Sequence, residues 1–187
     1  MHYQPFYSLY PKIAEKETRV ITFLSNEKIP MGSYAIVPAF CVDKTCDCRR
    51  ALVNIVEDKP ETIHKPLATI SYGWEDFSFY RNWASYLDDE AIAEFKGPVL
   101  DRMQPQSEHA PFLLKTFVDL IENDVDYYQR LQRHYAYFKH KKGMRLPLKL
   151  KKLMEPLAPC PCESGKIFKM CCGRAKRRTK YGNRKKR

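Results

Sequence analysis

Four cysteines near the C-terminus have the spacing of a metal site. One residue separates Cys160 from Cys162, and the adjacent Cys171 and Cys172 follow after eight intervening residues. Four thiolates this close in sequence can surround one tetrahedral Zn²⁺, because a short loop closes at small entropic cost. The alternatives are disulfides and free buried thiols, but bonding Cys171 to Cys172 requires a strained ring and the total of seven cysteines is odd. The sequence therefore predicts one zinc ion bound here.

The residues around these cysteines resemble the SEC-C motif, a zinc module found at the C-terminus of the SecA translocase ATPase and in small bacterial proteins. The resemblance covers residues 158–173, APCPCESGKIFKMCCG, and Glu163 stands where family members usually have Gly. The positions that match the surroundings of the ligands are Ser164, Gly165, Lys166, Phe168, Lys169 and Gly173. The resemblance implies that the four cysteines ligate zinc. It also implies a contact surface, with partners that include the ribosome and a secretion chaperone.

A second group of cysteines, Cys41, Cys46 and Cys48, lies between two predicted strands. Three thiolates and a fourth ligand can bind a second zinc ion. The candidates for the fourth ligand are His2, Glu75 and Asp76, since His64 falls at the opposite end of the expected sheet. The alternatives are free thiols, a redox trio, or a catalytic zinc with an open position. No general base is evident beside these cysteines to support catalysis.

The charge of the chain is concentrated at one end. The net charge is +11, yet residues 141–187 hold 17 basic and two acidic residues, while residues 1–140 hold 16 basic and 20 acidic ones. This asymmetry predicts a polyanionic partner. No apolar stretch reaches 18 residues and no secretory signal is evident, so we expect a cytoplasmic protein that does not insert into membranes.

The basic C-terminus favours RNA as that partner. A run of like charges is by default a solvated, disordered tail, but nine Lys or Arg among residues 174–187 also suit phosphates, and Tyr181 can stack on a base. No helix-turn-helix or zinc finger suited to a DNA major groove is evident. The residues predicted to contact nucleic acid are Lys166, Lys169, Arg174, Lys176, Arg177, Arg178, Lys180, Tyr181, Arg184, Lys185, Lys186 and Arg187.

The residue patterns along the chain predict strands and helices that make up an α+β fold. Runs rich in β-branched and aromatic residues predict antiparallel strands at 19–24, 33–40, 51–56 and 67–72, with Pro38 marking an edge strand or a bulge. Helical patterns follow at 75–87, at 88–96 behind Asp88, after a Ser107 cap, and at 125–141. The expected parts are a globular domain at 1–141, a basic Pro-containing linker at 142–159, a zinc knuckle at 160–173 and a basic tail at 174–187.

The predicted helix at 125–141 has two faces. The apolar positions Tyr128, Leu131, Tyr135 and Phe138 predict the face that packs on the core. The second face interleaves basic and aromatic residues, which suits either ordinary solvent exposure or RNA. Its residues are Tyr127, Arg130, His134, Tyr137 and Lys141.

Taken together, these patterns predict a protein that is not an enzyme. The sequence contains no G-x-S-x-G, P-loop or H-E-x-x-H motif, and no small-molecule substrate is indicated. We expect a zinc-binding protein that associates with the ribosome or other structured RNA through its knuckle and tail. The alternative is an adaptor in secretion or chaperone traffic, in which the knuckle binds a protein partner.

Overall fold

The chain folds into two compact units, Met1–Leu153 and Met154–Arg187. The computed structural model describes residues 2–25, 27–59, 62, 65–144, 146–154, 156–158, 160–162 and 164–174. The predicted tail contacts from Lys176 to Arg187, and His64, lie outside the described residues. The first unit combines an antiparallel sheet with helices, which confirms the α+β class.

One antiparallel sheet forms the centre of the first unit. The four predicted strands are confirmed as consecutive neighbours, namely β2 (Arg19–Phe23), β3 (Gly32–Cys41), β4 (Arg50–Glu57) and β5 (Ala68–Gly73). Two further strands, β1 (Tyr3–Pro5) and β6 (Val99–Leu100), pair with β3 and β5. Each has three residues or fewer, which is too short for an alternating pattern to be visible in the sequence.

Pro38 occupies an interior strand, which corrects the expectation of an edge strand or bulge. On one side of β3, β2 pairs with residues 32–36 and β1 pairs with residues 39–41. Pro38 therefore stands where β3 faces neither of them, while β4 pairs with it on the other side. A residue without a backbone N–H is tolerated there because no partner strand requires the donor.

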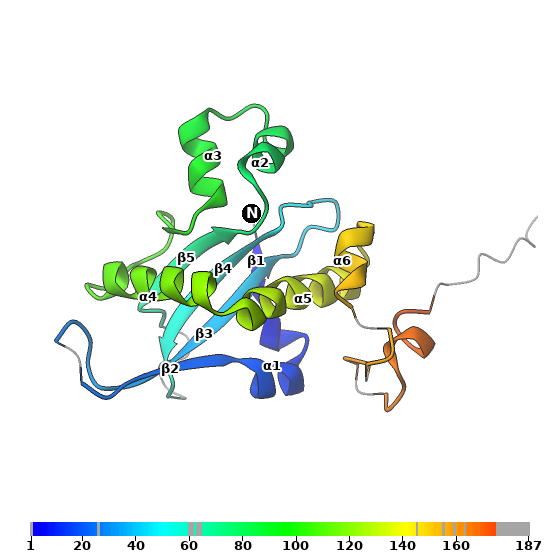
Figure 1. The fold of residues 1–187 in the computed structure, drawn as a ribbon, viewed down its shortest axis with the longest axis horizontal. Coiled ribbons are helices and arrows are strands. Elements are labelled where there is room, and N and C mark those ends of the chain that lie inside the picture. Colours follow the sequence, from blue (N-terminus) through cyan, green and yellow to red (C-terminus); the bar gives the residue numbers. More distant parts are fainter. Residues whose placement is uncertain are drawn as a thin grey trace, which may run out of the picture. The chain divides into compact units, whose positions relative to one another are not determined.

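Helices α4 (Ala110–Asn123) and α5 (Val125–Lys141) lie across one face of the sheet (Figure 1). The ring of Phe40 on β3 packs against Tyr135 and Phe138 of α5, at centroid distances of 5.7 and 5.6 Å. Leu131, Tyr135 and Phe138 of the predicted core face are buried, whereas Tyr128 is only half-buried. Aromatic side chains bury large areas, so these contacts contribute much of the packing energy between the helix and the sheet.

These two helices begin in different ways. The carboxylate of Asp124 accepts a hydrogen bond from the backbone N–H of Tyr127 at 2.8 Å and starts α5, an interaction typical of a capping residue. The predicted Ser107 cap of α4 is wrong. His109 is the N-cap and makes no side-chain cap, while Ser107 Oγ accepts from the N–H of His109.

Most of the second face of α5 is buried, with Lys141 as its exposed member, so this face is neither an ordinary solvated face nor free to bind RNA. His134 is only 4% exposed and stacks on the ring of Phe6 with centroids 4.0 Å apart. Tyr127 and Tyr137 are similarly buried, and Arg130 Nη1 donates to the backbone oxygen of Glu17 at the end of α1 (Pro11–Glu17). Side chains that combine an apolar part with a polar tip can be buried even where their pattern suggests a solvent-exposed face. Here the N-terminal segment covers them.

Helices α2 (Phe77–Trp83) and α3 (Asp89–Lys96) form a small subsidiary core beyond the end of β5 (Figure 1). Tyr80 and Ile92 are fully buried between them. Asp88 caps α3 by accepting from the N–H of Ala91 at 2.9 Å, as predicted. Negative groups at this end also interact favourably with the helix dipole.

The last helix of the first unit is short and basic. Within α6 (Leu148–Lys152) only Leu150 is buried, while Lys149, Lys151 and Lys152 are exposed. The second unit has little regular structure in its described part, where a 3₁₀ turn spans Phe168–Met170. Among the described residues, no helix is both long and apolar enough to cross a membrane.

Candidate metal centres

The four C-terminal cysteines converge in the second unit. One sulfur atom from each of Cys160, Cys162, Cys171 and Cys172 lies within 4.8 Å of all the others. We refer to this set as the C-terminal thiol cluster. The Sγ atom of Cys162 lies 3.3 Å from the Sγ atoms of both Cys160 and Cys171, well beyond the length of a disulfide bond. Sulfur atoms around a tetrahedral zinc are about 3.8 Å apart, so the four thiols are gathered at the scale of a metal site.

A few backbone contacts shape the loop that carries this cluster. The N–H of Cys160 donates to Lys166 O at 2.7 Å, and the N–H of Gly173 donates to Phe168 O at 2.8 Å. Gly165 turns the chain between the two cysteine pairs with φ of +71°, a conformation that favours glycine. A Cβ at Gly173 would come within 2.7 Å of the Phe168 ring, so glycine is also required at that close approach.

Hydrogen bonds and burial give the cysteines of the C-terminal thiol cluster different pKa values. Hydrogen bonds from Ser164, Cys171 and Cys160 lower the pKa of Cys162 to about 6. Burial raises the pKa of Cys160, and burial together with neighbouring thiols raises the pKa of Cys172 to about 12. A cation that replaces the shared protons would relieve this competition, because metal ligation requires deprotonated sulfur.

The second group of cysteines also converges, within the first unit. The sulfur atoms of Cys41, Cys46 and Cys48 all lie within 4.8 Å of one another. Cys41 ends β3, and the other two lie in the loop that leads to β4. We refer to this set as the loop thiol cluster. Hydrogen bonds from Cys46 and Cys48 lower the pKa of Cys41, and the same contacts raise the pKa of its two partners.

A buried lysine holds the loop thiol cluster in place. Lys139 of α5 is completely buried, and its Nζ donates at 2.9 Å to the backbone oxygens of Asp43 and Cys46. A buried ammonium is costly unless hydrogen bonds and negative charge compensate it. The positive charge of Lys139 acts on all three cysteines and favours their ionised forms. The lysine thus both fixes the loop and provides a counter-charge for thiolates.

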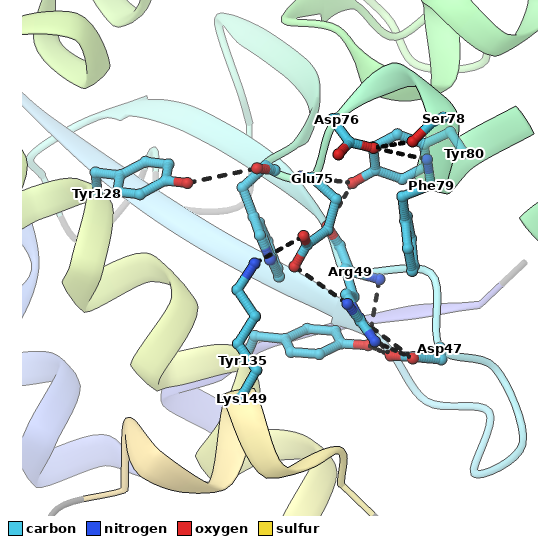
Figure 2. Close-up of polar contacts among 11 residues, drawn as sticks. Asp47, Arg49, Glu75, Asp76, Ser78, Phe79, Tyr80, Tyr128, Tyr135 and Lys149 are labelled. Atoms are coloured by element: carbon cyan, nitrogen blue, oxygen red, sulfur yellow. Dashed lines mark hydrogen bonds and ion pairs between the residues drawn. The ribbon is translucent and has the colours of Figure 1, made fainter.

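A network of ion pairs and hydrogen bonds fixes the end of the same loop (Figure 2). Arg49 bridges two carboxylates, with its Nη2 2.8 Å from Asp47 and its Nη1 3.3 Å from Glu75. The backbone oxygen of Arg49 accepts from the Tyr80 hydroxyl at 2.9 Å, and its N–H donates to Tyr135 at 3.3 Å. The network ties the loop to α2 and α5, so the sulfur positions are set by the fold of the first unit.

Of the three residues expected as a fourth ligand, Glu75 and Asp76 are engaged in other contacts, and His2 lies beside the loop through its backbone. Glu75 is 2.9 Å from Lys149 Nζ as well as paired with Arg49, so its carboxylate is engaged elsewhere (Figure 2). Asp76 is the N-cap of α2, accepting from the N–H of Phe79 at 2.7 Å. His2 lies beside this loop, and its backbone oxygen accepts a hydrogen bond from the N–H of Val42 at 3.0 Å. No fourth His, Cys, Asp or Glu of the described chain joins the three sulfurs.

Both sets of cysteines are visible in the sequence, but the residues that surround the loop thiol cluster are not. The predicted helix that carries Lys139 gave no sign that this residue, one of several lysines, would be buried against the cysteine loop. Arg49 was likewise unremarkable in the sequence, although its φ of +47° marks it in the structure. Of the predicted nucleic-acid contacts, Lys166, Lys169 and Arg174 are described, and all three are exposed.

Comparison with known proteins returns no similarity on which to base a function. No protein-family model matches the chain, and neither a curated protein nor a solved structure matches it.

Proposed function

We propose that this chain is a non-enzymatic zinc protein that binds the ribosome or another structured RNA through its C-terminal unit. The observation that carries the proposal is the convergence of four sulfur atoms within 4.8 Å in a unit whose described charged residues are all basic. A tetrathiolate zinc site carries a net charge of about −2 and is a structural site without an open position. It orders a loop and performs no chemistry of its own.

The zinc would give this unit its shape. Phe168 is the largest buried side chain of the described second unit, which is too little for an independent core. Metal binding can supply the missing free energy of folding, as it does in small zinc domains. The SEC-C resemblance of residues 158–173 supports the same ligand set.

The basic surface supports RNA as the partner. Lys166, Lys169 and Arg174 are exposed around the C-terminal thiol cluster, and the basic residues 175–187 follow directly in sequence. Each Lys or Arg that neutralises a phosphate releases a counterion, so binding should weaken steeply with salt. A short zinc-ordered loop would place the start of the tail at a fixed point on the RNA.

A second zinc belongs to the same proposal. Cys41, Cys46 and Cys48 supply three soft ligands, with the ammonium of Lys139 balancing the net negative charge of a zinc tris-thiolate. His2 is the candidate for the fourth ligand that the fold brings alongside the loop. This centre would be structural and would lock the β3–β4 loop.

Ribosome co-sedimentation across a salt series tests the proposal. We expect the zinc-loaded protein to pellet with ribosomes at low salt and to release as salt rises, and we expect chelation to abolish pelleting. Exchanging Lys166 and Lys169 together for Gln should weaken binding several-fold and flatten the salt dependence. The matched control is the same exchange at Lys44 and Lys115, two exposed lysines of the first unit. Unchanged pelleting after both chelation and removal of 174–187 would contradict the proposal.

One observation favours the alternative of a protein-binding adaptor in secretion or chaperone traffic. The second unit exposes three apolar side chains, with Leu157 at 73%, Met170 at 58% and Ile167 at 37% exposure. Exposed apolar residues grouped on a small unit are typical of protein contacts. Nuclease treatment separates the two functions, because it removes an RNA partner from the purified complex and leaves a protein partner in place.

A further inference from the structure

Two consecutive arginines at the start of β4 have opposite environments. Arg49 is paired with Asp47 and Glu75, as described above. Arg50 is 7% exposed, yet no carboxylate of the described residues lies within ion-pair distance of it. Buried charges in proteins are normally paired, because desolvation without a counter-charge costs several kcal/mol. Arg50 therefore has an unfilled requirement for an anion.

The neighbours of Arg50 position its guanidinium without neutralising it. Its Nη2 donates to the hydroxyl of Ser71 on β5, and its Cζ lies 4.2 Å from the ring centroid of Phe95 on α3. Its Nε is buried and has no hydrogen-bond partner among the described residues. A hydroxyl and an aromatic face hold a guanidinium in a fixed orientation, but neither carries a negative charge.

Arg50 lines a pocket of about 520 Å³ between the sheet and α3. Leu52 and Val99 supply apolar walls beside Phe95, while Ser71 and Tyr3 supply hydroxyl groups. Pockets of this volume accommodate small organic molecules, and a few polar groups among apolar walls fix the orientation of such ligands.

The carboxylates in the pocket wall are already engaged. Glu94 lies 2.6 Å from the guanidinium of Arg102, so these two rim charges cancel. Asp101 accepts a hydrogen bond from the backbone N–H of Met103 at 2.9 Å, within its own turn. The buried positive charge inside the pocket is thus that of Arg50.

We propose that this pocket binds a small organic anion, with the anionic group on Arg50 and the apolar part of the molecule against Leu52, Phe95 and Val99. The site is independent of the two thiol clusters and of the proposed RNA surface. A guanidinium pairs with a carboxylate or phosphate through parallel hydrogen bonds, which gives selectivity for anions over neutral molecules of the same shape. Binding would tie α3 to the sheet.

The test compares two fluorescent probes that differ in one charged group, anilinonaphthalene sulfonate and the neutral phenylnaphthylamine. Both are titrated into the full-length, zinc-loaded protein. We expect the sulfonate to bind at a single site at least tenfold more tightly than the neutral probe. Arg50→Met should lower sulfonate affinity at least tenfold and change the affinity for the neutral probe by less than threefold.

Two further variants complete the test. Arg81→Met is the matched control, since Arg81 also lies over an aromatic ring, that of Phe77, but is outside the pocket and paired with Asp89. It should leave both affinities unchanged. If Arg50→Met does not fold, Ala91→Trp fills the pocket from α3 and should abolish binding of both probes. Equal affinities for the two probes, or undiminished sulfonate binding in Arg50→Met or in a folded Ala91→Trp, would overturn the proposal.

Discussion

The loop thiol cluster and the C-terminal thiol cluster gather the same chemical groups in two different settings. The loop thiol cluster lies between two strands of a large sheet and is held by Lys139 of α5 and by the Arg49 network. The C-terminal thiol cluster lies in a unit with Phe168 as its main buried side chain and a few backbone hydrogen bonds. The fold of the first unit positions the loop thiol cluster. In the second unit, the metal site itself would have to order the residues around it.

The two settings imply two uses of a bound metal within one chain. Where the fold already places the sulfur atoms, zinc would add stability to a structure that exists without it, and its removal would change the structure only near the site. Where the fold places few of the surrounding residues, zinc binding and folding would be a single event.

Removing zinc should unfold the second unit and leave the first unit folded. Structural zinc in small domains contributes about 10–16 kcal/mol, far more than the described contacts of the second unit can replace. Hydrogen exchange measures this directly. With chelator, the amides of Cys160, Phe168 and Gly173 should lose protection, while those of β3 and β4 keep theirs. Retained protection at Phe168 and Gly173 would contradict the contrast.

Replacing Lys139 by Met should destabilise the first unit by about 2–4 kcal/mol, since two backbone carbonyl oxygens lose the donor that the buried ammonium supplies. Chemical denaturation measures the change, and the zinc content of the loop thiol cluster should fall with it. The matched control is Lys141→Met, an exposed position on the same helix, which should be neutral. An equal loss of stability in both variants would show that Lys139 has no special role.

Part of the stability of the first unit in acid should depend on the ionisation of Glu17. Hydrogen bonds from His134 and Arg133 lower the pKa of Glu17 from 4.5 to about 2. Burial lowers the pKa of His134, so its neutral ring donates through Nε2–H. Because the folded pKa is depressed, the stabilisation is fully present above about pH 4.5 and is lost as the pH falls towards 2.

Glu17→Gln tests this dependence. Since Glu17 is partly exposed, we expect a loss of about 1–2 kcal/mol at pH 7 that shrinks to near zero at pH 2. Urea denaturation of both proteins across that range gives the difference. Glu15→Gln, at an exposed position of the same helix, is the control. A difference that does not vary with pH would rule out the ionised carboxylate as its source.

The smallest expected effect concerns the C-terminal thiol cluster. Ser164 Oγ donates to Cys171 Sγ at 3.1 Å. Hydrogen bonds to metal-bound sulfur orient it and stabilise its charge, so Ser164→Ala should weaken zinc binding by about three- to tenfold. Competition with a colorimetric zinc chelator measures this change. The loop thiol cluster should retain its own affinity in the same variant, and a parallel loss there would show that the two sites are coupled.

The sequence predicted the elements that have a repeating pattern and missed the contacts between distant ones. The strands from Arg19 to Gly73 and the core face of α5 were readable because burial imposes a period. The burial of His134 under Phe6 was not readable, since it depends on where the N-terminal segment packs. Both thiol clusters were visible as spacing. The buried Lys139 and the unpaired Arg50 follow only from the folded arrangement.

Native mass spectrometry of the intact protein counts the zinc ions that the two thiol clusters hold. We expect two zinc ions in the wild-type chain. Cys46→Ser should leave one, with the second unit still ordered, and Cys162→Ser combined with Cys171→Ser should leave one, with the second unit unfolded. Two results would contradict the assignment of one zinc ion to each thiol cluster. One is a wild-type protein that carries no zinc although it was purified with zinc present, and the other is a C-terminal double variant that still carries two ions.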